Sequence, residues 1–180
     1  GSNMPSQKSH NSLSGISSEQ SAATETTEQR VAQLLDYLAT HPDAVVRYHA
    51  SDMVLNIHSD ASYLNETRAR SHMAGYYFLG STPQDGQPIK LNEAIFIFCG
   101  ILKCVVASAA EAETGGLFAN SQLALPIRQS LHALGHKQPP TPLKTDNSTA
   151  YKFVHNDMKQ KMSKSWDMRF NWLRDRTVIQ

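Results

Sequence analysis

A predicted β-strand over residues 53–62 carries a single acid, Asp60, near its end, and this strand constrains the fold more than any other segment. Its β-branched and aliphatic residues partly alternate with polar ones, and it contains neither Gly nor Pro, which is typical of a strand. Three further acidic signals follow at the boundaries of predicted elements: a Glu-Ala-Glu sequence at 111–113, then Asp146, then Asp167. A fold that places the acid-bearing strands side by side would bring these carboxylates together.

Hydrophobic periodicity and turn residues predict the other elements. Thr26 and Gln29 fit a capping box that would start a helix, and the segment 41–43 would end it. Pro126 should divide the helical segment 109–136 into two helices, because a proline inside a helix removes a hydrogen bond. We also expect strands at 44–48 (in a hairpin with 53–62), 74–80, 93–98 and 143–146, helices at 147–155 and 167–176, and a helix stop at Gly135.

Strands followed by a helix, another strand and further helices describe an α/β fold with a mixed central sheet flanked by helices. A length of 180 residues with 40% hydrophobic residues is enough for one domain with a real core. The longest apolar run, 94–102, is too short to span a bilayer, so we expect no membrane association. Cys99 and Cys104 lack metal-site spacing and are expected to be buried thiols of an intracellular protein.

The chain is expected to have three regions. Residues 1–4 look like a cloning remnant, and the segment up to residue 24 is rich in Ser, Gln, Thr and Asn with few large apolar side chains. We therefore expect residues 1–24 to be a tag and a disordered linker. Residues 25–42 should form one helix, and residues 43–180 should form the α/β domain.

Positive charge is concentrated near the C-terminus. Residues 137–176 contain nine basic residues and four acids, an excess of five positive charges, whereas the whole chain carries a net charge of +1. A basic segment interleaved with acids that could hold metal suits a polyanionic substrate. The alternative is an ordinary solvated surface.

Several motifs, in this order, resemble those of the ribonuclease H domain of Copia-type LTR retrotransposon polyproteins. The segment 30–38 is similar to the helix that joins that family's reverse transcriptase to its nuclease. The Glu-Ala-Glu motif and the Asp-Asn motif at 146–147 carry most of the similarity, which covers about residues 30–176. The matching segments are Ser59-Asp60-Ala61-Ser62, 75–80, 106–113, 145–150 and 164–170.

The sequence departs from the family pattern at a few positions. The family usually has His two residues before its last acid, where this chain has Ser165; His155 is a candidate substitute on the adjacent loop. Thr114 replaces the Tyr that often follows the second Glu, and the loop 81–92 is longer than usual. These departures support an alternative, in which a catalytically inactive ribonuclease H-like domain serves as a nucleic-acid or protein interaction scaffold.

The resemblance implies a ribonuclease H-like fold and an Mg²⁺-dependent endonuclease that hydrolyses the RNA strand of RNA/DNA hybrids. Such an enzyme uses two Mg²⁺ ions, for which Mn²⁺ can substitute, to activate a water and stabilise the leaving oxygen. Asp60 would bridge both ions, Glu113 and Asp146 would complete one site, and Asp167 would complete the other. Glu111 lies about 200° around the helix from Glu113, so both cannot face one site, and the family register favours Glu113.

The hybrid would be recognised by its shape, through 2′-hydroxyls and phosphates. Asn147 and Ser148 are candidates for such contacts, although Asn147 could equally cap the following helix. The expected partners are the hybrid and an upstream reverse transcriptase domain of the same polyprotein, in the cytoplasm within a retroelement particle. The side chains expected on the phosphates are Lys159, Lys161, Lys164 and Arg169.

These four basic residues predict that hybrid binding weakens steeply with salt, because each phosphate contact releases counterions from the nucleic acid. Four contacts would reduce the affinity on the order of a hundredfold between about 50 and 200 mM salt. Fluorescence anisotropy with a labelled hybrid measures this dependence. An affinity that stays constant over that range would show that the basic segment does not bind the phosphates.

Overall fold

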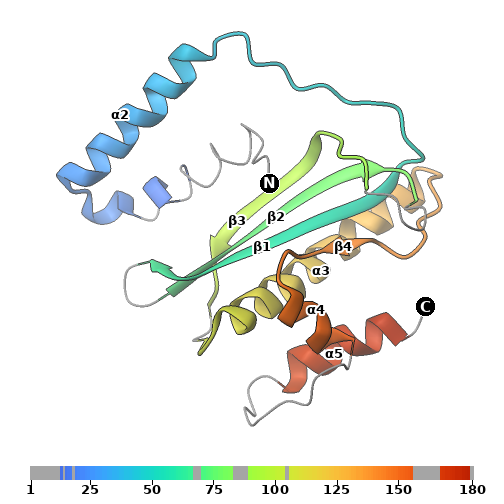
Figure 1. Ribbon diagram of the computed structural model, residues 1–180. Coiled ribbons are helices and arrows are strands. Elements are labelled where there is room, and N and C mark those ends of the chain that lie inside the picture. The colour runs from blue at the N-terminus through green and yellow to red at the C-terminus, as the bar shows by residue number, and fades with distance from the viewer. Residues whose placement is uncertain are drawn as a thin grey trace. The chain divides into compact units, whose positions relative to one another are not determined.

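The structure is a computed structural model that describes residues 13, 15–17, 19–66, 70–82, 89–103, 106–155 and 167–178 (Figure 1). Within these ranges, only the backbone is described at 65–66, 70, 149, 153, 167–170 and 177–178. The chain forms two compact units, residues 1–48 and residues 49–180.

The first unit contains helix α2 (Glu25–Thr40), which begins at the expected residue and ends two residues before the predicted end at 42. Thr24 is its N-cap and forms a capping box with Thr27, so the predicted box at Thr26 and Gln29 is wrong. Three threonines lie close together at this point of the sequence, and several of them suit a helix start. Only Thr24 adopts the extended backbone of an N-cap, with φ −122° and ψ 170°.

A contact with Glu19 accompanies this choice of cap. The Glu19 carboxylate accepts a hydrogen bond from the Thr27 hydroxyl at 2.8 Å and one from Arg30 at 2.6 Å. Glu19 directly precedes the short 3₁₀ helix η1 (Gln20–Ala22). The first turns of α2 are therefore tied to the segment before it.

The predicted strand at 44–48 does not form, and Val45, Val46 and Tyr48 are exposed. A strand needs a partner with free backbone hydrogen-bonding groups. The first sheet strand, β1 (Val54–Glu66), offers no free edge there, since it pairs on one side with a second strand and on the other side meets Gln138. The Gln138 amide accepts from the Leu55 N–H at 3.0 Å and donates to the Met53 carbonyl at 2.9 Å.

The second unit is built on a mixed four-stranded sheet in the order β3-β2-β1-β4 (Figure 1). β2 (Arg70–Gly80) pairs antiparallel with β1 and with β3 (Ala94–Ile101), whereas β4 (Leu143–Lys144) pairs parallel with β1. The predicted α/β class with a mixed central sheet and flanking helices is confirmed. β1 is thus a central strand with partners on both edges, which suits its high content of buried residues.

One long helix, α3 (Ala109–Ala133), lies along a face of the sheet and continues through Pro126 (Figure 1). The predicted break is therefore wrong. Proline removes the hydrogen bond to the carbonyl of Gln122, but Gln122 and Pro126 are both exposed, so solvent can satisfy that carbonyl. The helix ends where predicted, because Gly135 adopts φ +92° and the His136 N–H bonds back to the Leu131 carbonyl.

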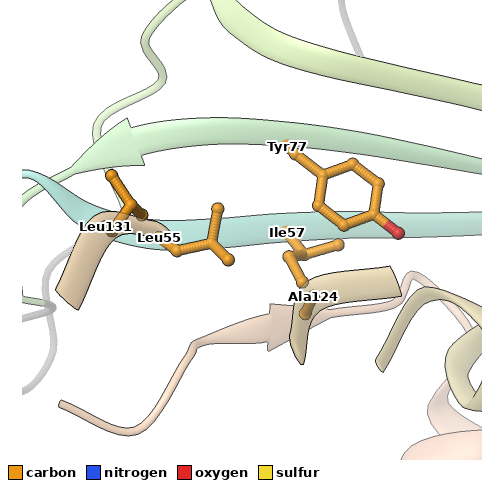
Figure 2. Close-up of a cluster of buried hydrophobic side chains, with 5 residues drawn as sticks. All are labelled: Leu55, Ile57, Tyr77, Ala124 and Leu131. Atoms are coloured by element: carbon orange, nitrogen blue, oxygen red, sulfur yellow. The ribbon is translucent and has the colours of Figure 1, made fainter. Parts of the chain in front are cut away.

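Alternation along β1 and β2 creates the main core against α3 (Figure 2). Leu55 and Ile57 of β1 and Tyr77 of β2 point toward Ala124 and Leu131 of α3, and all five are buried. Burying a side chain of the size of Leu or Ile stabilises a fold by about 2 kcal/mol. This packing fixes the distance between α3 and the strands.

The last two helices, α4 (Ser148–Val154) and α5 (Asp167–Val178), pack on α3. Leu117 of α3, Ala150 of α4 and Leu173 of α5 form a second buried cluster. An edge-to-face contact joins the rings of Phe118 and Trp172 at 5.2 Å. No helix in the described ranges is long and apolar enough to cross a membrane.

Candidate metal centre

Parallel pairing of β1 with β4 places Asp60 beside Asp146. The two strands pair at Ile57 with Leu143 and at His58 with Lys144. Each acid follows the second of these pairs by two residues, so the register that starts the ladder also aligns the acids. Both side chains are exposed, as expected at the end of a short parallel ladder.

Glu113 reaches the same place from α3. The helix lies close to β1 at Gly116, where a Cβ atom would make ordinary van der Waals contacts with Ser59 and Ala61, at 3.4 and 3.6 Å. The Glu113 carboxylate accepts a hydrogen bond from the Ala61 N–H at 3.3 Å through Oε1 and one from the Thr145 hydroxyl at 3.3 Å through Oε2. Glu113 is only 5% exposed. Its two hydrogen-bond donors are neighbours of the other acids, since Ala61 follows Asp60 on β1 and Thr145 precedes Asp146 after β4.

One carboxylate oxygen from each of Asp60, Glu113 and Asp146 lies within 4.8 Å of the other two. Across the part of the chain that the structure describes, none of these acids forms an ion pair with Lys or Arg. Carboxylates brought this close repel one another, and a cation relieves the repulsion. An all-oxygen donor set with two exposed members suits a hard divalent ion such as Mg²⁺, which retains water ligands. The residues present therefore fit a divalent metal site.

The acidity of these groups reflects the same crowding. Burial raises the pKa of Glu113 to about 7; the hydrogen bonds from Ala61 and Thr145 oppose this rise, and the charges of Asp60 and Asp146 add to it. Desolvation also raises the pKa of Asp60, and the charge of Asp146 raises it further. The site resists full ionisation unless positive charge is supplied.

Glu111 has a different role at the start of the same helix. Ser108 caps α3 by accepting a hydrogen bond from the Glu111 N–H at 3.1 Å, and the Glu111 carboxylate accepts one from the Ala107 N–H. This reciprocal arrangement is a variant of the capping box and directs the Glu111 side chain back along the chain. Among the described residues, the cluster of acids contains Glu113 and not Glu111, and the choice of Glu113 as a metal ligand stays a prediction.

The other predicted site residues are only partly within the described structure. Asp167 is the first residue of α5, but its side chain and that of Arg169 lie outside the described residues, as do Lys159, Lys161 and Lys164. Asn147 lies next to the cluster and caps α4, because its side-chain oxygen accepts a hydrogen bond from the Ala150 N–H at 3.0 Å. Of the predicted nucleic-acid contacts, Ser148 is exposed beside Asn147.

His155, the candidate substitute for the missing family histidine, is exposed at the end of α4. Its ring contacts the ring of Tyr151 one helical turn earlier in a tilted arrangement, with 4.3 Å between the ring centroids. The two side chains form a small aromatic surface on α4.

Two residues that shape the site were not predicted. Thr145 links Glu113 to the end of β4, and its hydroxyl also accepts a hydrogen bond from the Asn147 N–H at 3.2 Å. Asn120 is fully buried on α3 behind the cluster. The sequence holds one signal for Asn120, because it follows Glu113 by seven residues and so shares its helix face.

Comparison with known proteins yields one structural similarity. No protein-family model matches the sequence, and no curated protein matches it. Among solved structures, the chain is similar to LC11-RNase H1, isolated from compost by a metagenomic approach, with 9% sequence identity and a TM-score of 0.48. The similarity covers 71% of this chain and 78% of that chain.

The raised pKa of Glu113 predicts a pH-dependent stability in the absence of metal. Its carboxyl ionises near pH 4.5 in the unfolded chain but near pH 7 in the folded one, so the folded state binds more protons between these values. Stability should therefore fall as the pH rises from about 5 to 7, by up to about 3 kcal/mol, and then level off.

Thermal unfolding in a chelating buffer, recorded from pH 5 to pH 8, measures this effect. Glu113→Gln should remove most of this fall; Asp60, whose pKa is also raised, adds to the fall that remains, and His58, whose pKa is lowered, opposes it. Glu111→Gln is the matched control and should keep the wild-type slope. A wild-type stability that does not change over this range would contradict the buried position of Glu113.

Proposed function

We propose that this protein is an Mg²⁺-dependent endonuclease that hydrolyses the RNA strand of RNA/DNA hybrids. The observation that carries the proposal is the convergence of Asp60, Glu113 and Asp146 from three separate elements within 4.8 Å. Within the described part of the chain these acids have no Lys or Arg partner, and such a cluster costs stability, which favours a functional role for it over a purely structural one.

The three acids would have different roles, because they differ in solvent exposure. Asp60 and Asp146 are exposed and can face a phosphodiester group and solvent together. Glu113 is buried and held by Ala61 and Thr145, so it supplies a fixed oxygen behind them. Divalent ions held by these acids would activate a water and stabilise the leaving 3′-oxygen.

Asp167 is proposed as the fourth acid, completing a second metal position in a two-metal mechanism. Its backbone begins α5, and α5 packs on α3 through Leu173 and Trp172. Because α3 also carries Glu113, the packing of α5 on it would determine where the fourth acid lies relative to the other three.

The proposed substrate follows from the surroundings of the acids. Ser148 and the exposed Lys144 flank Asp146 along the chain, and the basic segment 137–176 continues beyond them. Ser148 and Asn147 would contact 2′-hydroxyl groups, while Lys159, Lys161, Lys164 and Arg169 would bind phosphates. The 2′-hydroxyl is the group by which such a site would select the RNA strand.

The biological setting is proposed from the sequence motifs. The segment 30–38, within α2, resembles the helix that joins the reverse transcriptase and the nuclease of Copia-type polyproteins. In that setting the hybrid would arise during reverse transcription, and the upstream reverse transcriptase would be the partner of this chain inside a retroelement particle.

A labelled RNA/DNA hybrid tests the activity. The wild-type protein should cleave the RNA strand in Mg²⁺ or Mn²⁺ and not in a chelator. Asp60→Asn and Glu113→Gln should each reduce the rate by several orders of magnitude, because each replaces a charged ligand with little change in volume. Glu111→Gln is the matched control for Glu113→Gln and should change the rate only modestly.

Two outcomes would contradict the proposal. Cleavage by Asp60→Asn at the wild-type rate would exclude the metal assignment. A wild-type protein that binds hybrid but cleaves it in neither metal would favour the inactive scaffold instead.

A further inference from the structure

Asn120 is a fully buried polar side chain in the interface between α3 and the sheet. It follows Glu113 by seven residues, about two helical turns, so both side chains lie on the face of α3 that packs on β1 and β2. A buried amide costs free energy unless all its hydrogen-bonding groups are used. The hydrogen-bond partners of Asn120 therefore indicate why a polar side chain is buried at this position.

The Asn120 amide nitrogen donates to β1, which carries Asp60, and to the neighbouring strand β2. One hydrogen bond goes to the Ser59 hydroxyl at 2.8 Å, and the other goes to the Ala74 carbonyl at 3.0 Å. Ser59 directly precedes Asp60, and Ala74 is the residue opposite Asp60 in the β1–β2 ladder. The two bonds thus fix α3 to the rung of the sheet that carries Asp60.

The Ser59 and Ala74 acceptors allow the Asn120 amide one orientation, and Tyr77 and Gly75 lie beside its oxygen. The Tyr77 hydroxyl lies 2.8 Å from the Asn120 side-chain oxygen and 3.1 Å from its backbone carbonyl. A flipped amide would place its oxygen against the Ala74 carbonyl, which cannot donate a hydrogen bond. At Gly75, a Cβ atom would lie 2.3 Å from the Asn120 side-chain oxygen, so only glycine leaves room for the amide there.

We propose that Asn120 is a positioning residue that sets the separation of Asp60 and Glu113 and thereby the affinity for the divalent cation. α3 carries both Asn120 and Glu113, and the partners of Asn120 flank Asp60 on two strands, so the amide links one metal-binding element to the other. This inference rests on the proposed metal site. Residues that orient metal ligands from behind typically change metal affinity by about 10- to 100-fold when they are removed.

Tyr77→Phe separates this role from simple stabilisation of the core. It removes a buried hydroxyl and should lower the melting temperature, but it leaves both Asn120 donors on Ser59 and Ala74. Asn120→Ala removes the donors themselves. A residue that only stabilised the fold would change metal affinity in proportion to the lost stability in both variants.

Isothermal titration calorimetry with Mn²⁺ alone, on the full chain, measures the affinity without reference to activity. Asn120→Ala should weaken Mn²⁺ binding about tenfold or more, whereas Tyr77→Phe should bind like the wild type. High Mg²⁺ concentrations should restore hybrid cleavage by Asn120→Ala but not by Asp60→Asn. If Asn120→Ala does not fold, Ser59→Ala replaces it, since that change removes one partner of the amide and should weaken binding to a smaller extent.

The possible results distinguish this inference from the proposed function. Wild-type affinity in Asn120→Ala, or in Ser59→Ala where it is the variant used, would overturn the positioning role and leave the metal site intact. Equal losses in Asn120→Ala and Tyr77→Phe would overturn it as well. A wild-type protein that binds no Mn²⁺ would contradict the metal site itself, and the positioning role with it.

Discussion

The packing of α3 on β1 and β2 is the constraint on which the site depends. Buried apolar side chains, Leu55 and Ile57 among them, hold the C-terminal half of the helix on the sheet. Near its N-terminus, the helix lies close to β1 at Gly116. Glu113 lies three residues before Gly116 on the same helix, so its carboxylate cannot move away from the aspartates without separating the helix from the sheet. The hydrophobic core therefore holds together acids that repel one another.

That repulsion connects structure with function. Partial burial and neighbouring negative charge raise the pKa of both Asp60 and Glu113, which is a cost to the metal-free protein. A divalent cation bound by the acids would relieve their mutual repulsion. This relief would add to the binding free energy, because the site is already assembled before the ion arrives. Hydrogen bonds from Ala61 and Thr145 reduce the cost at Glu113 without neutralising its charge.

The sequence predicted the parts of the fold that depend on local pattern. The strand β1 and the helix stop at Gly135 follow from residue pattern and from backbone preference, and the structure agrees with both. The failures arose where tertiary context decides. Pro126 is tolerated because its face of α3 is exposed, and the predicted hairpin of 44–48 with β1 does not form because β2 and Gln138 already occupy the edges of β1 there.

The unpredicted parts of the site depend on contacts between residues far apart in the sequence. The hydrogen bond between Asn120 and Ser59 joins residues 61 positions apart, and the one between Thr145 and Glu113 joins residues 32 positions apart. No local sequence pattern predicts contacts over such separations. Asp60 and Asp146 could be paired in advance only through their motifs, since the two-residue strand β4 is too short to give a pattern of its own.

The most direct test of the account is a crystal structure of the protein with Mn²⁺ and an RNA/DNA hybrid, with anomalous scattering used to locate the metal. The account predicts an anomalous peak within about 2.0–2.5 Å of one carboxylate oxygen from each of Asp60, Glu113 and Asp146, beside a phosphate of the RNA strand. A hybrid bound on another face, or a peak that none of these three acids contacts, would contradict it.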